Sequence, residues 1–251
     1  MVGVTTFRSG NPTLTAKTFA KYRIAPGVEQ MTLGGTVNKT AMSLGVLLIA
    51  ALYVWNRGAD DPRLGVWILV SSIAGLIVML VTVFKNAWAP YTTLVYAGLQ
   101  GIALGGVSVL TEPAYPGIVG QAVFLTFGTL GALLVAYRSG MIQPTQNFRL
   151  GVVAATGGIF VLYLVGFALS FFGVQVPLIH SNGPIGILFS VFVVVLASLN
   201  LVLDFDFIEQ GVSQGAPKHM EWYGAFGLLV TLVWLYLEIL RLLSKLRSRS
   251  R

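Results

Sequence analysis

The chain is organised as long apolar runs separated by short polar breaks. Seven runs are long enough, or nearly so, to cross about 30 Å of hydrocarbon as α-helices. The shortest is the first, which has 17 residues. Runs of this kind predict an all-α membrane protein with seven transmembrane helices. We expect these helices at 40–56, 64–84, 91–111, 117–137, 149–172, 184–204 and 222–243.

The connections between the runs are too short to hold a soluble domain. Residues 1–38 are polar and basic, with little periodicity, and predict a flexible tail that rests on the membrane surface. We therefore divide the chain into this N-terminal tail, a transmembrane domain at 39–246 and a basic C-terminal tail at 247–251.

Composition supports a membrane protein and removes several function classes. The chain is 55% hydrophobic and 10% charged, whereas soluble domains carry about 25% charged residues. It has no cysteine, which excludes disulfides and thiolate chemistry. With two histidines, we do not expect a histidine-based metal cluster. The net charge of +7 is expected to set orientation and contact anionic lipid, not nucleic acid.

Lysine and arginine positions predict a cytoplasmic N-terminus, because basic residues accumulate on the inner side of a membrane. With this orientation the outer loops before the last helix hold only Arg57 and Arg63. The inner side holds the basic N-terminal residues with Lys85, Arg138, Arg149 and Lys218. The basic C-terminal tail breaks this pattern. A full seventh crossing would place that tail outside, and a re-entrant last segment would keep it inside.

A stripe of small residues follows one face of the third run. It consists of Gly98, Gly101, Gly105 and Ser108, and ends at Glu112. Small residues let helices approach closely in lipid, so we interpret the stripe as a packing face. A similar stripe on the fourth run comprises Gly117, Gln121, Gly128 and Gly131. A water-lined path is the alternative, with Glu112 either a solvated loop acid or part of an outer vestibule.

Acidic residues end the uncharged run 184–203. Carboxylates at the edge of hydrocarbon are expensive, so a chain that keeps them is expected to use them for a proton, a cation or a partner charge. Asp204 shares a helical face with Asn200, whereas Asp206 lies about 200° further around the helix. We therefore expect Asp204 to face inward, and Asp206 and Glu209 to be solvated at the cytoplasmic boundary.

A further acid, Glu238, lies inside the last run, on a polar stripe with Thr231, Arg241 and Lys245. Such a stripe faces protein or water. Glu238 can pair locally with Arg241 or Lys245, or it can face an acid on another helix. No HExxH, GxSxG, GxGD or glycine-rich phosphate motif is present, so we do not expect an enzyme.

These last two runs resemble a known family. The segment SLNLVLDFDFIEQG at 198–211, followed by LYLEILRLLSKLR at 235–247, is similar to the final helices of the transmembrane Bax inhibitor motif family, and especially to its bacterial branch. The resemblance implies six helices around a central seventh, in the bacterial plasma (inner) membrane. It also implies a pH-sensitive calcium leak, with calcium as the permeant ion and no cofactor.

The resemblance further implies which residues gate the leak. An acid on the sixth helix and an acid on the seventh share a proton, and they map to Asp204 and Glu238. Two carboxyls in a poorly solvated site cannot both ionise cheaply. When both are ionised, their oxygens would offer a low-affinity calcium site. The family more often has aspartate at the second position. Its basic residue at the inner end of the second helix maps to Lys85.

Helix lengths leave open whether these two acids touch. Asp204 is about 30 Å beyond Pro184, and Glu238 is about 24 Å beyond Trp222. Contact needs a seventh helix that begins well outside the membrane or re-enters it, or a sixth helix that continues towards Gln214.

Two other functions stay open. The protein could be a regulator that binds another membrane protein, such as a quality-control protease, without transport. It could also be a proton-coupled transporter of a small solute, with Asp204 and Glu238 as proton carriers.

Overall fold

The chain folds into a bundle of long helices, seen in a computed structural model that describes residues 29–170, 172–173 and 181–249. Seven helices in this part are long and apolar enough to cross a membrane, which confirms the predicted class. They are α2 (Leu33–Trp55), α3 (Leu64–Phe84), α4 (Ala89–Thr111), α5 (Ile118–Arg138), α6 (Gln146–Ser170), α8 (Pro184–Ser213) and α9 (Met220–Arg249), with a 3₁₀ turn, η1 (Asn86–Trp88), before α4.

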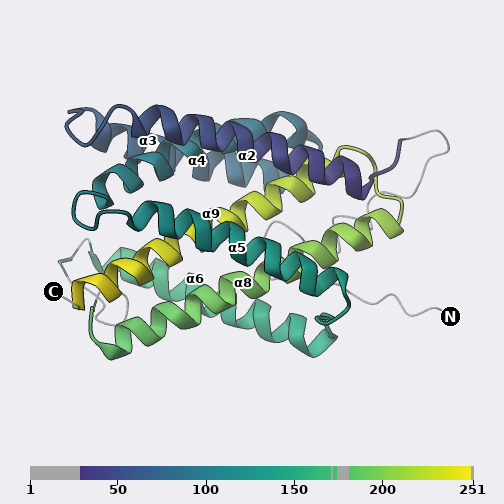
Figure 1. The fold of residues 1–251 in the computed structure, drawn as a ribbon. Helices are drawn as coiled ribbons and strands as arrows, with labels where there is room; N and C mark the ends of the chain where they lie inside the picture. Colours follow the sequence, from purple (N-terminus) through teal and green to yellow (C-terminus); the bar gives the residue numbers. More distant parts are fainter. Residues whose placement is uncertain (1–28, 171, 174–180, 250–251) are drawn as a thin grey trace.

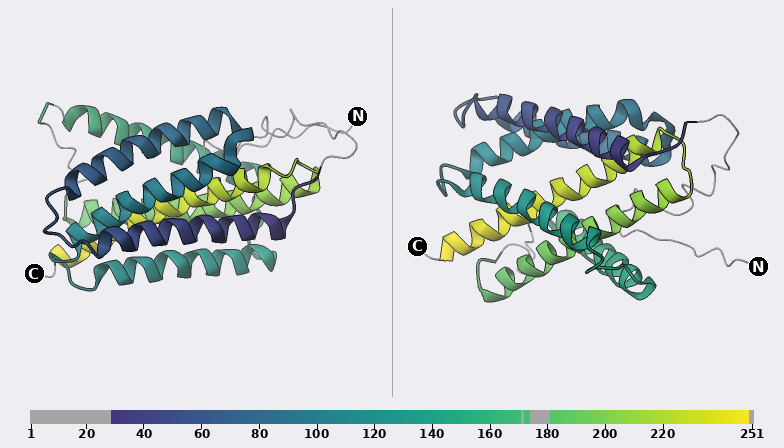
Figure 2. Two further views of the ribbon diagram at one scale, coloured as in Figure 1. Left: turned by 90° about the horizontal axis from the view of Figure 1, so that it is seen from above. Right: turned by 45° about the vertical axis from the view of Figure 1, so that its right-hand side comes forward.

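The last helix, α9, is at the centre of the bundle. In its apolar window 67% of the residues are buried, against 17% in α3, α5 and α6. Figure 1 shows α9 between α2, α3 and α4 on one side and α6 and α8 on the other, with α5 across it. Helix α3 packs on α4, at the outside of the bundle (Figures 1 and 2).

Residues 29–38 are not part of a flexible tail, so the predicted boundary at 38 is wrong. Met31 donates its backbone N–H to the Ala216 carbonyl, and Gln30 bridges Pro217. Helix α2 then begins at Leu33, where the Thr32 hydroxyl caps it by accepting from Gly35 N–H. The start of α2 could not be predicted from this polar sequence, because the segment before it is held by hydrogen bonds to the loop between α8 and α9. The rest of the predicted tail, 1–28, lies outside the described residues.

The last two helices are longer than their apolar runs. Helix α8 continues nine residues beyond Asp204, and Phe205, Phe207 and Ile208 in this extension are buried. Helix α9 is continuous through Arg249, so the described part of the last segment runs through the bundle once as a single helix without turning back. The predicted bounds stopped at the charged residues, which here lie inside the packed helix pair.

The glycine stripe of α4 is a packing face, as predicted. A Cβ on Gly101 would lie 2.3 Å from the Leu47 carbonyl oxygen, and a Cβ on Gly105 would lie 2.6 Å from the Ala51 carbonyl oxygen. Both contacts are with the backbone of α2. On α5 the glycines behave differently, since a Cβ on Gly128 or Gly131 would meet no atom within 4 Å. These two glycines therefore face open space.

Candidate functional site

Asp204 links the last two helices. Its side chain is completely buried, and its Oδ2 accepts a 2.6 Å hydrogen bond from the Thr231 hydroxyl on α9. Burial of a carboxyl in a membrane-spanning bundle is costly unless polar groups surround it. The inward position expected for Asp204 is therefore found, with a hydroxyl on the central helix as a partner.

Glu238 belongs to a cluster with α6. Its side chain is 2% exposed. Arg241 Nη1 donates to both Glu238 oxygens, at 2.9 and 3.1 Å. The Tyr163 hydroxyl donates to Glu238 Oε1 at 2.8 Å, and Arg241 Nη1 lies 2.8 Å from this hydroxyl. Of the two local pairings considered for Glu238, the structure contains the one with Arg241.

The register of the α8–α9 hairpin places Asp204 and Glu238 at different levels. Asp204 lies opposite Thr231. Near the other end, Lys245 Nζ donates to Ser190 Oγ at 2.9 Å. Glu238 is seven residues from both Thr231 and Lys245, so it lies about 10 Å along α9 from each. In this structure the two acids have different hydrogen-bond partners. The predicted sharing of a proton between Asp204 and Glu238 would need a direct hydrogen bond, and their different levels along α9 do not allow one.

The length of α8 determines which residue of α9 lies opposite Asp204. Asp204 lies nine residues before the end of α8, and Thr231 lies eleven residues after the start of α9. Both helices therefore extend by a similar length towards the α8–α9 loop, and Asp204 and Thr231 lie side by side. The sixth helix does continue towards Gln214, but this brings Asp204 to Thr231 and not to Glu238.

The other acids of α8 are held by side chains instead of being simply solvated. Arg149 on α6 donates to Asp206 at 2.9 Å, and Gln210 donates to the same carboxylate at 2.8 Å. Glu209 is exposed but accepts a hydrogen bond from the Tyr137 hydroxyl. The expectation of solvated carboxylates is wrong for Asp206, because α6 supplies its cation.

Asn200 lies one turn before Asp204 and is 1% exposed. Its Nδ2 donates to the Thr156 hydroxyl and the Leu196 carbonyl, both at 2.9 Å, while its Oδ1 has no hydrogen-bond partner among the described residues. Asn200 therefore extends the polar face of α8 from Asp204 towards α6.

Two further candidates lie away from this face. Lys85 follows α3, and its ammonium lies 4.3 Å from the centre of the Trp88 ring. Glu112 caps α5, because its oxygens accept from Gly117 N–H at 2.5 Å and Val119 N–H at 3.1 Å. Neither residue is brought to Asp204. Glu112 is a structural cap that also lines a cavity.

Glu221 was not among the sequence candidates, and Lys245 was noted only as a possible partner of Glu238. Glu221, fully buried in the first turn of α9, pairs with Lys39 on α2 and accepts two 2.9 Å hydrogen bonds from Thr32. Lys245 is also buried, and it donates to the Gly186 carbonyl as well as to Ser190. No sequence signal singled out Glu221, because it lies just before the predicted run 222–243 and its partners come from the start of α2.

Asp204, Asp206 and Glu238 each have their own side-chain partner. Within the described residues, no three histidine, aspartate or glutamate side chains gather closely enough to hold a metal ion.

Comparison with known proteins identifies a family. A family model described as Bax inhibitor 1 like matches residues 11–248. No curated protein and no solved structure matches the chain.

Proposed function

We propose that this chain, which belongs to the Bax inhibitor 1-like family, is a pH-responsive calcium leak of the bacterial plasma membrane, gated at Asp204. The observation that carries the proposal is the buried Asp204 carboxyl, bonded to Thr231 between α8 and the central helix. A charge at this position is expensive in hydrocarbon. The protonation state of Asp204 therefore has a large effect on how the two helices fit together.

The gate works through the charge of this single carboxyl. When Asp204 is protonated, it is neutral and the pair of helices stays closed around the hydrogen bond with Thr231. When Asp204 is ionised, the buried charge favours entry of water and of a cation that compensates it. A hard dication such as Ca²⁺ is preferred by carboxylate and hydroxyl oxygens. Proton loss and calcium entry are thus coupled at one residue.

Glu238 has a supporting part in this proposal. Its ion pair with Arg241 and its bond with Tyr163 join α9 to α6 about two turns from Thr231. Calcium that passes Asp204 next meets this cluster, where it must compete with the Arg241 guanidinium for the carboxylate. We therefore assign Glu238 to the second barrier of the pathway.

The proposed orientation has the N-terminus in the cytoplasm, as the basic residues predict. The two ends of α9 can then be assigned from their contacts. Arg247 Nη1 donates to the Pro116 carbonyl in the α4–α5 loop, whereas Met31 bonds to the α8–α9 loop. The C-terminal end of α9 is therefore opposite the start of α2, on the outer side in this orientation.

The test is calcium flux into liposomes that contain the purified protein and an enclosed calcium dye, across a pH series. We expect a pH-dependent flux in the wild type and a flux without this pH dependence in Asp204→Asn. Asp206→Asn is the matched control, because it removes the same charge two residues away on another face. Glu238→Gln should change the size of the flux more than its pH profile.

The outcomes separate the candidate functions. A wild-type protein that passes no calcium at any pH would refute the leak and favour the regulator without transport. Uptake of a small solute that depends on a proton gradient would favour the transporter. An unchanged pH profile in Asp204→Asn would place the gate at another residue.

A further inference from the structure

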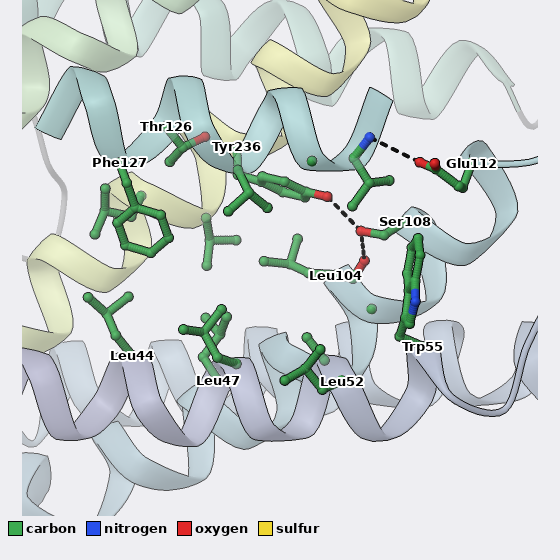
Figure 3. A pocket seen from close by; sticks show the side chains of 18 of the residues that line it. Leu44, Leu47, Leu52, Trp55, Leu104, Ser108, Glu112, Thr126, Phe127 and Tyr236 are labelled. Carbon is green, nitrogen blue, oxygen red and sulfur yellow. Dashed lines mark hydrogen bonds between the residues drawn. The ribbon is translucent and has the colours of Figure 1, made fainter. Parts of the chain in front are cut away.

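A large apolar cavity lies on the other side of the central helix. Its volume is about 420 Å³, which is within the range of ligand sites. Figure 3 shows it between α2 and α5, with Tyr236 of α9 at its inner wall. Its lining is almost wholly apolar, with Leu44, Leu48, Leu52 and Phe127 among the residues that form it.

The polar atoms in the wall already have partners. Ser108 Oγ and the Tyr236 hydroxyl are 2.6 Å apart, and Ser108 also donates to the Leu104 carbonyl. The Thr126 hydroxyl donates to the Ala122 carbonyl. A cavity with such walls offers little to water, because water needs two to four polar partners. It is suited to a hydrocarbon occupant.

The cavity opens sideways, towards the lipid. Leu48, Leu52 and Phe127 line it and are 39%, 57% and 38% exposed, so they form its rim on the outer surface of the bundle. Along α2 the lining extends from Leu44 to Trp55, which is about 16 Å of helix. This is about half of the 30 Å hydrocarbon thickness. The cavity therefore spans one leaflet.

The end of the cavity nearest the loops is polar, and an arginine lies beside it. Glu112 and Gly117 lie there, and the Glu112 carboxylate is engaged by the N–H groups of Gly117 and Val119. The Arg247 guanidinium is held beside this end by its 2.7 Å bond to the Pro116 carbonyl. An apolar slot of one leaflet's length matches the shape of an acyl chain, and Arg247 beside its end offers a cation for a phosphate, while the Glu112 carboxylate is already bonded to two backbone N–H groups.

We propose that one acyl chain of a membrane phospholipid occupies this cavity, with the phosphate of its headgroup next to Arg247. The lipid enters sideways from the leaflet at the C-terminal end of α9. Its chain contacts Leu232, Val233 and Tyr236, so it packs directly on the central helix. This site is separate from Asp204 and does not depend on the proposed calcium leak.

The test uses a glycine that lines the cavity. A Cβ on Gly120 would meet no atom within 4 Å, so Gly120→Phe can fill the cavity without a clash with the backbone. Gly128→Phe is the control, because Gly128 is on the same helix, also faces open space and does not line the cavity. Native mass spectrometry of the protein purified in mild detergent counts the phospholipids that stay bound.

We expect one retained phospholipid in the wild type and in Gly128→Phe, and an occupancy about tenfold lower in Gly120→Phe, which corresponds to about 1.4 kcal/mol. Arg247→Ala should also lower retention. Size-exclusion chromatography checks that each variant is folded, and Gly120→Leu replaces Gly120→Phe if the larger side chain prevents folding. Equal retention in the cavity-filling variant and the wild type would overturn the proposal, as would bound detergent or free fatty acid in place of a phospholipid.

Discussion

Asp204 and Thr231 occupy the same level of the α8–α9 hairpin, and their side chains share a 2.6 Å hydrogen bond. The family resemblance suggested a second carboxyl at this place. Instead, the central helix presents a hydroxyl to Asp204, and Glu238 lies about two turns further along α9. A hydroxyl can donate to an ionised carboxylate or accept from a protonated carboxyl. Thr231 is thus able to stay bonded to Asp204 in both protonation states.

Replacement of Thr231 should therefore alter both stability and gating. Thr231→Val keeps the shape of the side chain but leaves the buried carboxyl without this donor, at a cost of about 1–3 kcal/mol. We expect a lower melting temperature and a displaced pH profile of calcium flux in liposomes. Thr231→Ser retains the hydroxyl and should keep the wild-type pH profile. A normal profile in Thr231→Val would show that Asp204 responds to protons without help from this hydroxyl.

The number, type and approximate limits of the helices could be predicted from the apolar runs. The run at 64–84 coincides with α3. The ends of α2 and α8 could not be found in this way. Residues at 33–39 are polar and rich in glycine, and they become helical because Thr32 and Lys39 contact Glu221 across the bundle. Contacts of this kind join residues about 190 positions apart and leave no local pattern.

The candidate site was predicted in part. Helical angles were enough to separate Asp204 from Asp206 and to give Asp204 an inward position. The partner of Asp204 was missed because it depends on how two helices align, which the sequence of each helix does not define. The Arg149–Asp206 pair was missed for the same reason, since α6 and α8 are separate in sequence.

The ion pair between Lys39 and Glu221 should be important for stability. Glu221 is 1% exposed and Lys39 is 16% exposed, and the loss of one member of a buried pair strands the other charge. We expect Glu221→Gln and Lys39→Met each to destabilise the protein by about 3–5 kcal/mol, measured as a fall in the thermal unfolding temperature in detergent.

The exposed pair between Lys218 and Glu29 is the matched control for this prediction. It joins the same two regions, but its side chains are 50% and 76% exposed, and exposed pairs contribute little. Lys218→Met should leave the unfolding temperature unchanged. Equal effects of Lys39→Met and Lys218→Met would show that burial of the first pair has no energetic consequence.

Close packing of α4 against α2 should make Gly105 intolerant of any side chain. A Cβ there would lie 2.6 Å from the Ala51 carbonyl oxygen, so Gly105→Ala must push the two helices apart, at about 1–3 kcal/mol. Gly98→Ala on the same stripe is the control, because its Cβ would lie 3.9 Å from Val46 Cγ1, an ordinary contact. Thermal unfolding should separate the two variants. A similar unfolding temperature for both would mean that α2 can shift at no cost.

His219, in the loop before α9, should make the protein less stable in acid. Burial lowers the pKa of its imidazole below the usual value, because a buried site disfavours the charged form. Below pH about 6.5, the unfolded chain therefore binds a proton more readily than the folded protein, and stability falls as the pH decreases from there towards the lower pKa of the folded state. His219→Gln cannot bind this proton. Unfolding temperatures of both proteins should differ little at pH 8, and at pH 5 the wild type should have lost more stability than the variant. Parallel curves across this range would show that His219 has no part in the acid response.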